Sequence, residues 1–113
     1  MDYKPIDLTE FDKLEEMLQD AGIEYEREDS ESATPDFKWE FHQLRSLETV
    51  GEKWLWDVIC NTGSYGSDGG LLEMWGKDIN EPDGWLSARE CFGKIKEILK
   101  NHEQHRRKHK SAE

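Results

Sequence analysis

Residues 61–76, NTGSYGSDGGLLEMWG, place five glycines and two serines between two apolar runs. Glycine-rich loops bind phosphate when their backbone N–H groups converge on the anion, usually at the start of a helix and often with a following lysine. Here the glycines lead into LLEMW, which has the composition of a strand, no Lys-Ser/Thr pair follows, and Asp68 would repel a phosphate. We therefore predict a turn between two strands, because glycine adopts the positive φ angles that such a turn needs.

The tip of this turn is also a candidate contact surface. We expect four side chains to be exposed there, namely Ser64, Tyr65, Ser67 and Asp68. A tyrosine on an exposed loop is a frequent anchor in protein interfaces. A turn without a partner is the first interpretation of these residues, and a recognition turn is the second.

Acidic residues gather in a second candidate region, residues 24–31. The members are Glu24, Glu26, Glu28, Asp29 and Glu31. Ile23 and Tyr25 alternate with the first three, which predicts a strand over residues 23–28 with one carboxylate face. A solvated strand face explains this pattern without a ligand. The functional interpretation is a docking surface for a basic partner, with slower association when the three glutamates are reversed in charge.

Catalytic and metal-binding patterns are weak. His42 lies on the predicted polar face of a strand without a matched nucleophile, and the carboxylates are too numerous to single out a pair. Histidines 102, 105 and 109 would share a helix face, but the surrounding arginines and lysines oppose a cation. Cys60 and Cys91 lie in apolar stretches and are expected in the core. We expect a non-enzymatic protein with no metal and no cofactor.

The charge is strongly acidic and unevenly distributed. The chain has 26 Asp and Glu against 15 Lys and Arg, for a net charge of −11. Residues 94–113 carry seven Lys/Arg and three Asp/Glu, so residues 1–93 carry a net charge of −15. An acidic body repels nucleic acid and attracts basic partners.

No apolar run approaches the roughly 18–20 residues that cross a bilayer, and the start MDYKPIDLTE lacks the order of a secretory signal. We therefore expect a cytoplasmic protein without membrane contact.

Hydrophobic periodicity predicts the elements that position these residues. Residues 7–21 have the spacing of an amphipathic helix, and residues 38–47, 53–60 and 71–75 have the patterns of strands, with loops at 29–37 and 76–84. In residues 53–60, alternation would put Trp54, Trp56, Val58 and Cys60 on one face. Ser87 and Glu90 form a capping box that begins a second helix.

These elements predict an α+β fold: an N-terminal helix, a three- to four-stranded antiparallel sheet and a C-terminal helix. Both helices on one sheet face is the simplest arrangement, but five tryptophans exceed what one such core needs. Either a partner buries the second face, or the helices divide between the two faces. We expect one domain over residues 1–100 and a basic, frayed tail over residues 101–113.

The order of several motifs resembles that of a group of small proteins encoded by phages and prophages of Gram-positive bacteria. The motifs are FDKLEEMLQDAGIEYERE, the pair His42–Gln43, GSYG followed by GLLEMWG, and GWLSARECFGKI. They encode no chemistry, so the resemblance assigns no functional residues. It implies an accessory protein that acts in the host cytoplasm.

Three hypotheses follow. The first is a protein that binds and blocks a basic surface of a host protein, such as an RNA-guided nuclease or another defence enzyme, as anti-CRISPR proteins do. The acidic strand would supply attraction, and Tyr65 with an exposed tryptophan would supply anchors. The second is a binder of a nucleotide signal that uses the glycine-rich loop and the tryptophans. The third is a phage structural protein or homo-oligomer, for instance a homodimer, that buries its aromatic sheet face. Direct nucleic-acid binding is not expected.

Overall fold

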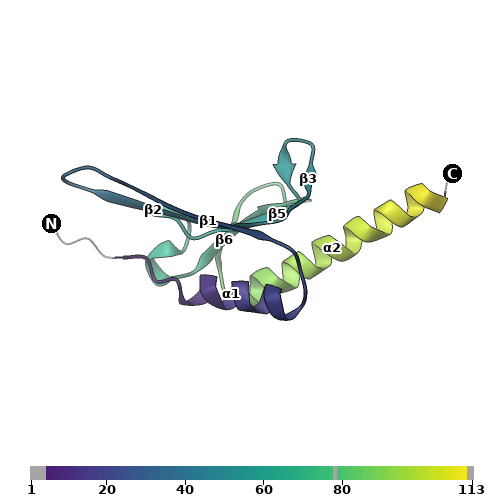
Figure 1. Cartoon of the computed structure of the whole chain (residues 1–113), viewed down its shortest axis with the longest axis horizontal. Helices are drawn as coiled ribbons and strands as arrows, with labels where there is room; N and C mark the ends of the chain where they lie inside the picture. The colour runs from purple at the N-terminus through teal and green to yellow at the C-terminus, as the bar shows by residue number, and fades with distance from the viewer. Residues whose placement is uncertain (1–4, 78, 112–113) are drawn as a thin grey trace.

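The computed structural model describes residues 5–77 and 79–111, with side chains up to residue 104. Within these residues the fold is α+β, as predicted, with an N-terminal helix, an antiparallel sheet and a C-terminal helix (Figure 1). The elements are α1 (Thr9–Asp20), β1 (Glu26–Ala33), β2 (Lys38–Arg45), β3 (Thr49–Val50), β4 (Lys53–Trp54), β5 (Trp56–Ile59), the 3₁₀ turn η1 (Ser67–Gly69), β6 (Leu72–Gly76), β7 (Asp83–Leu86) and α2 (Ala88–Ser111). The main sheet of the described chain has five strands in the order β1-β2-β5-β6-β7, and β3 and β4 form a separate hairpin.

Both helices lie on the same side of the main sheet (Figure 1). The apolar stripe of α1 buries Phe11, Leu14 and Leu18. The stripe of α2 buries Ala88, Cys91, Ile95 and Ile98. The sheet packs against both helices through six buried side chains: Leu44, Trp56, Val58, Leu72, Met74 and Leu86. The core is therefore a single layer between one sheet face and two helices, as the hydrophobic periodicity predicts.

The capping box at the start of α2 is confirmed. The Ser87 backbone N–H donates to Glu90 Oε1 at 3.1 Å, and the Glu90 N–H donates to Ser87 Oγ at 3.2 Å. Helix α2 then continues to Ser111 and projects past the sheet (Figure 1), so its backbone enters the segment 101–113 that we expected to be frayed. Residues 112–113 lie outside the described residues.

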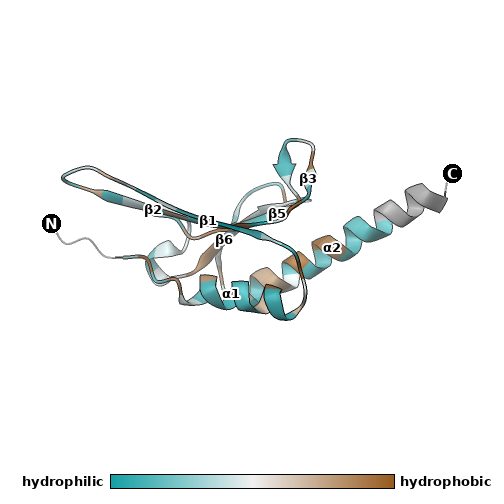
Figure 2. Ribbon diagram, viewed as in Figure 1, coloured by the Kyte–Doolittle hydropathy of each residue, from teal (hydrophilic) through white to brown (hydrophobic). Residues whose placement is uncertain are grey.

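Residues 29–33 and 83–84 are strand where the sequence predicted loop. The segment DSESA extends β1 to Ala33, because β1 pairs with β2 from Glu26↔Arg45 to Ala33↔Lys38. The turn falls later, where the Thr34 N–H donates to the Phe37 carbonyl at 2.7 Å. The result is a long β1–β2 hairpin, and β1 is mostly hydrophilic (Figure 2).

The predicted strand over residues 53–60 is interrupted at Leu55. Its N–H donates to the Glu48 carbonyl at 3.0 Å, and its own carbonyl accepts from the Lys77 N–H at 2.9 Å. This bend turns Leu55 into the core, so that Leu55 and Trp56 are both buried. The prediction that Trp54 shares the face of Trp56 is therefore wrong.

Candidate functional site

The sheet face turned away from the helices carries alternate side chains of β2, β5 and β6, and we call it the outer face. Its members alternate with buried residues and are neighbours across the strands. They are Phe41, Gln43 and Arg45 of β2, Asp57 and Ile59 of β5, and Glu73 and Trp75 of β6. Phe41 and Trp75 are 41% and 38% exposed despite their large rings. Exposed aromatic rings on a sheet face that neither helix covers are typical of an interaction surface.

Tyr65 and Trp85 adjoin this face beside Glu73. The Tyr65 N–H donates to Glu73 Oε1 at 3.0 Å, and the Trp85 N–H donates to the Tyr65 carbonyl at 3.3 Å. Gly84 packs against Tyr65 so closely that a Cβ at this position would overlap the tyrosine Cβ. The two aromatic side chains are 61% and 63% exposed. The backbone of this pair is thus held in place while both rings face solvent.

Trp85 is also the non-glycine residue with a positive φ angle, 60°, among the described residues. A left-handed conformation costs an L-amino acid about 1–2 kcal/mol. The register of β6 and β7 is irregular here, with Leu72 opposite Leu86 and Met74 opposite Asp83, so β7 bulges at Gly84 and Trp85. Strained residues that gain little burial often serve function, and Trp85 fits this description.

Asp57 is a partly buried carboxylate near the centre of the outer face. Gln43 donates a hydrogen bond to it, with Gln43 Nε2 3.1 Å from Asp57 Oδ2. Burial raises the pKa of Asp57 above its ordinary value, and the negative charge of Glu73 raises it further against the opposing effect of Gln43. No lysine or arginine of the described residues forms an ion pair with Asp57 or Glu73. The outer face therefore combines exposed rings with carboxylates that lack a cation.

The predicted acidic strand is only partly a free row of charges. Glu26 and Glu28 lie on the outer side of β1, and both contact Arg45, at 3.1 and 2.6 Å. The Arg45 guanidinium also lies 4.9 Å from the ring centroid of Trp54. Glu24 is exposed before the strand begins. Two of the three glutamates thus share one positive charge at this edge, and Glu24 lies exposed beside them.

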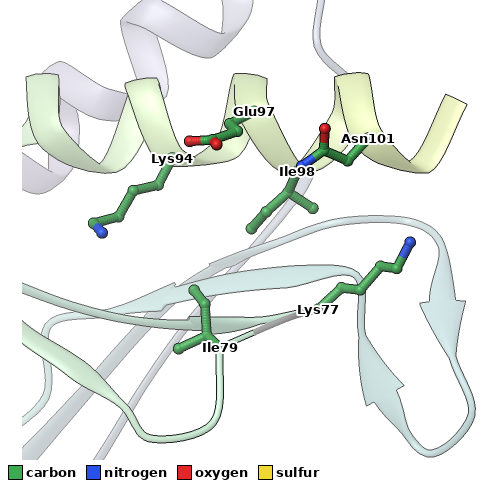
Figure 3. A pocket seen from close by; sticks show the side chains of 6 residues that line it. All are labelled: Lys77, Ile79, Lys94, Glu97, Ile98 and Asn101. Atoms are coloured by element: carbon green, nitrogen blue, oxygen red, sulfur yellow. The ribbon is translucent and has the colours of Figure 1, made fainter. Parts of the chain in front are cut away.

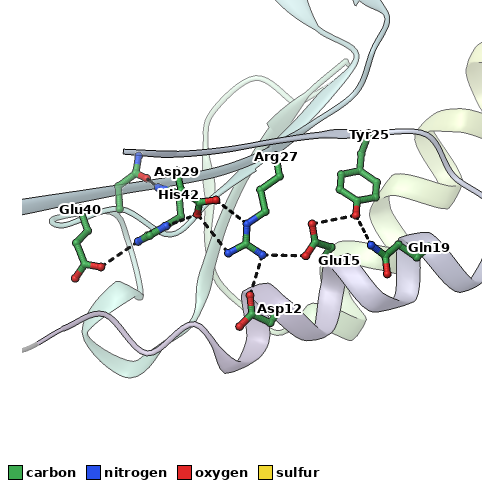
Figure 4. Close-up of polar contacts among 9 residues, drawn as sticks. Asp12, Glu15, Gln19, Tyr25, Arg27, Asp29, Glu40 and His42 are labelled. Atoms are coloured by element: carbon green, nitrogen blue, oxygen red, sulfur yellow. Dashed lines mark hydrogen bonds and ion pairs between the residues drawn. The ribbon is translucent and has the colours of Figure 1, made fainter. Parts of the chain in front are cut away.

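The other two members of the predicted row are engaged elsewhere. Glu31 pairs with Lys38 at 2.8 Å near the hairpin turn. Asp29 points to the helix side of the sheet, where it contacts Arg27 and His42 (Figure 4). Alternation alone explains this, since Asp29 is one residue out of step with Glu26 and Glu28. The five acidic residues are therefore not one surface.

His42 lies in a polar network between β1, β2 and α1 (Figure 4), and its predicted place on a polar face is wrong. Its side chain is largely buried, with Nδ1 2.6 Å from Asp29 and Nε2 3.2 Å from Glu40. The ring also meets Phe11 edge-on. The imidazolium form can donate to both carboxylates, whereas the neutral ring can donate to one. No Ser, Thr or Cys side chain of the described chain hydrogen-bonds to His42, so the network has no nucleophile.

Arg27 ties this network to α1. Its guanidinium contacts Asp29 at 2.8 Å and Asp12 and Glu15 at 2.9 Å, and lies 4.9 Å from the ring centroid of Phe11. Partial burial opposes the charge of Asp29, but hydrogen bonds from Arg27 and His42 outweigh it, so the pKa of Asp29 is lowered. The network is a structural clamp that fastens the β1–β2 hairpin to α1.

The glycine-rich segment 61–71 is the predicted turn, and its polar groups are used internally. The N–H groups of residues 67, 69, 70 and 71 donate to carbonyls within the loop. Ser64 Oγ donates to the Asn61 carbonyl at 2.9 Å and accepts from the Asn61 N–H at 3.0 Å. Ser67 is buried, which corrects its expected exposure, because the 3₁₀ turn folds it inward. Tyr65 and Asp68 are exposed. The loop presents a tyrosine but no set of free N–H groups for a phosphate.

A small groove of about 200 Å³ lies between α2 and the connection that follows β6 (Figure 3). Ile79 and Ile98 line it, and Lys77 and Lys94 point toward opposite ends. Lys94 is already paired with Asp83 at 3.0 Å. The groove lacks the convergent polar groups of a ligand site.

The remaining observations concern redox, metal and membrane chemistry. Burial raises the pKa of the Cys60 thiol to about 11 and that of Cys91 to about 12, so neither is a ready nucleophile. His102 contacts Glu48 at 2.9 Å, whereas the side chains of residues 105 and 109 lie outside the described set. In the part of the chain that the structure describes, no group of His, Cys, Asp and Glu is arranged to hold a metal, and no helix is long and apolar enough to cross a membrane. Comparisons with protein-family models, curated proteins and solved structures find no match to this chain.

Proposed function

We propose that this chain is a non-enzymatic binding protein whose outer face docks on a basic surface of a partner protein and blocks it. One observation carries the proposal: aromatic side chains are exposed beside carboxylates without cations, on the sheet face that neither helix covers. Trp75, Trp85 and Tyr65 supply the rings, and Asp57 and Glu73 supply the charge.

The two kinds of residue have different tasks. The net charge of −15 over residues 1–93 attracts a basic surface at long range and speeds encounter. Desolvated aromatic anchors then hold the complex, since a few such residues usually dominate interface energy. Because the charges attract the partner, affinity should fall as the salt concentration rises. Because the rings hold the complex, affinity should also fall at every salt concentration when the rings are removed.

The acidic edge of β1 has a secondary part in this proposal. Arg45 offsets part of the charge of Glu26 and Glu28 and holds their side chains in place. Reversing Glu24, Glu26 and Glu28 together would weaken the attractive field and slow association. The contact itself is assigned to the outer face beside them.

The class of partner is suggested by the resemblance to phage and prophage accessory proteins. Surfaces that bind nucleic acid are basic, and an acidic protein that covers one prevents its use. The most concrete form of the proposal is an inhibitor of a host defence enzyme, such as an RNA-guided nuclease, in the host cytoplasm. This form rests on analogy between gene types.

The other two hypotheses gain no support from the geometry. A nucleotide beside the glycine-rich loop needs several N–H groups that converge on its phosphate, but the N–H groups of residues 67, 69, 70 and 71 donate within the loop. Trp75 is accessible for stacking, whereas Trp56 is fully buried. A homodimer through the outer face would bury Asp57 and Glu73 of both copies, which costs free energy unless a cation pairs with them. Light scattering tests the dimer, and a thermal-shift panel of linear and cyclic nucleotides tests the nucleotide site.

The proposal is tested by affinity capture from a Gram-positive host lysate, followed by mass spectrometry. The bait is compared with a Tyr65→Ala/Trp85→Ala variant and with Glu16→Gln, a control on the exposed side of α1. We expect one nucleic-acid-handling protein that the parent and the control capture at low salt, and that the double variant or 0.5 M salt releases. Equal capture by all three baits, or no salt-sensitive partner, would contradict the proposal.

A further inference from the structure

Two arginines of this fold are bound in the same way. Each guanidinium lies 4.9 Å from the centroid of an aromatic ring, Phe11 for Arg27 and Trp54 for Arg45. Each also contacts two or more carboxylates: Asp12, Glu15 and Asp29 for Arg27, and Glu26 and Glu28 for Arg45. A ring with flanking carboxylates matches the guanidinium, which stacks through its plane and donates through its edge.

The outer face contains a third ring with flanking carboxylates, but no arginine. Asp57 and Trp75 are paired residues of β5 and β6, and Glu73 is two residues before Trp75 on the same face. Glu73 is the diagonal neighbour of Asp57, which corresponds to about 7–8 Å in an antiparallel pair. The neighbouring Arg45 is the paired residue of Asp57 on β2, but its ion pairs go to β1.

We propose that Asp57, Glu73 and Trp75 receive an arginine side chain of the partner protein. The inference rests on the proposed function and names its central contact. The guanidinium donates to the two carboxylates and stacks beside the indole, as Arg45 does against Trp54. Among basic side chains arginine suits the site better than lysine, because its planar fork can reach two acceptors while it contacts a ring.

Two cations of the described chain lie near this site: Arg45, which is linked to Asp57 through Gln43, and Lys53. The Lys53 Nζ lies 5.1 Å from the ring centroid of Trp75, yet it forms no ion pair with Asp57 or Glu73. Lys53 belongs to the exposed β3–β4 hairpin, whose strands are two residues each. An incoming guanidinium therefore competes with Lys53 for the ring, and at the carboxylates it meets neutral donors, Gln43 and the Tyr65 N–H, rather than a paired cation.

The electrostatic environment of Asp57 favours the binding of an arginine side chain. Burial, followed by the charge of Glu73, raises the pKa of Asp57, so its ionised form is held at a cost. A guanidinium that contacts both carboxylates removes the repulsion between them and lowers this pKa again. Binding should consequently release protons at a pH near the raised pKa. A second copy of this chain is a less suitable source of this arginine, because Arg45 of its outer face is already paired with Glu26 and Glu28.

The test uses a capped tetra-arginine peptide as the probe and capped tetra-lysine as the comparison. Affinity is measured by titration at fixed ionic strength for the parent chain, Asp57→Asn, Glu73→Gln and the control Glu16→Gln. Each variant removes one negative charge, so the general field falls equally in all three. The indole N–H resonances report the place of binding, since Trp75 and Trp56 lie on opposite faces of the sheet.

We expect tetra-arginine to bind several-fold more tightly than tetra-lysine and to shift the Trp75 indole resonance. Asp57→Asn and Glu73→Gln should each weaken tetra-arginine binding by about tenfold, and Glu16→Gln by less than about twofold. Equal losses in the three variants, equal affinity for the two peptides, or an unchanged Trp75 resonance would overturn the inference.

These outcomes are separate from those of the proposed function. If Asp57→Asn leaves capture of the partner intact while Tyr65→Ala/Trp85→Ala abolishes it, the outer face binds a partner without an arginine at this site. If tetra-arginine binds at Trp75 but no basic protein is captured, the arginine site stands and the proposed function fails.

Discussion

Arg45 and Asp57 are paired residues on adjacent strands, yet they do not form an ion pair. Arg45 donates instead to Glu26 and Glu28 on β1 and to Gln43 Oε1 at 2.8 Å, and Gln43 in turn donates to Asp57. Opposite charges directly across an antiparallel pair usually stabilise a sheet. Here the arrangement leaves a partly desolvated carboxylate without a cation at the centre of the outer face, where a partner can supply one.

The first prediction concerns the stability cost of Asp57. Because its pKa is raised above 3.8, the folded chain holds this proton more tightly than the unfolded chain. The contribution of the carboxyl to stability is full below about pH 3.8 and is lost as pH rises through the folded pKa. We expect Asp57→Asn, which keeps an acceptor for Gln43, to raise the free energy of unfolding at pH 7. Urea denaturation of the parent and the variant at pH 7 and at pH 4 measures this difference in the free energy of unfolding.

The gain from Asp57→Asn should shrink as the pH falls through the raised pKa, and it should vanish below 3.8, where the wild-type carboxyl is protonated in both states. A variant that is less stable than the parent at pH 7, or a difference that does not change with pH, would show that the carboxylate is satisfied within the fold.

The second prediction concerns the clamp beneath the sheet. Arg27→Met keeps the aliphatic stem over Phe11 but leaves Asp12, Glu15 and Asp29 without their shared cation. We expect a loss of about 2–3 kcal/mol in the free energy of unfolding. Lys38→Met is the matched control, since its pair with Glu31 lies at the exposed end of the same hairpin, where solvent screens the charges and the loss should be much smaller. Equal losses in the two variants would contradict the assignment of a clamp.

The third prediction separates two glycines. A Cβ at Gly84 would overlap Tyr65, whereas a Cβ at Gly93 of α2 meets nothing. We expect Gly84→Ala to destabilise the fold by about 1–3 kcal/mol through overpacking, and Gly93→Ala to stabilise it by about 1 kcal/mol through helix propensity. Thermal unfolding of both variants measures the difference. If Gly84→Ala is not destabilised, Tyr65 moves freely away from Gly84 and the overlap costs nothing.

The fourth prediction concerns the positive φ angle of Trp85. Trp85→Gly and Trp85→Ala both remove the ring, so their difference reports the backbone alone. Since φ is 60°, glycine should be more stable than alanine by about 1 kcal/mol. Both variants should bind the partner more weakly than the parent, because both lack the ring. If alanine proved as stable as glycine, the strain at this position would be disproved.

Local signals predicted most of the fold. The capping box of Ser87 and Glu90 fixed the start of α2, and the stripe from Ala88 to Ile98 fixed its buried face, because both depend on residues close in sequence. Segment DSESA was predicted as a loop from its composition. It is a strand because β2 supplies backbone partners along its whole length, which local propensity does not encode.

The candidate site was harder to predict, since it depends on long-range contacts. Tyr65 was correctly expected to be exposed, but its neighbour Trp85 comes from a bulge that sequence alone does not reveal. The prediction for His42 was wrong because its carboxylate partners are Asp29 of the neighbouring strand β1 and Glu40, two residues earlier in β2. The alternation of Glu26 and Glu28 was visible, whereas Arg45, their shared partner, required the register of β1 and β2.

The central claim is that the outer face, rather than the helices, contacts a basic partner. Tryptophan indole N–H resonances of ¹⁵N-labelled protein, recorded during titration with the captured partner, test it most directly. The account predicts that Trp75 and Trp85 shift or broaden first, while buried Trp56 and the amides around Glu16 of α1 stay unchanged. Changes confined to α1, with the Trp75 and Trp85 resonances unaffected, would contradict it.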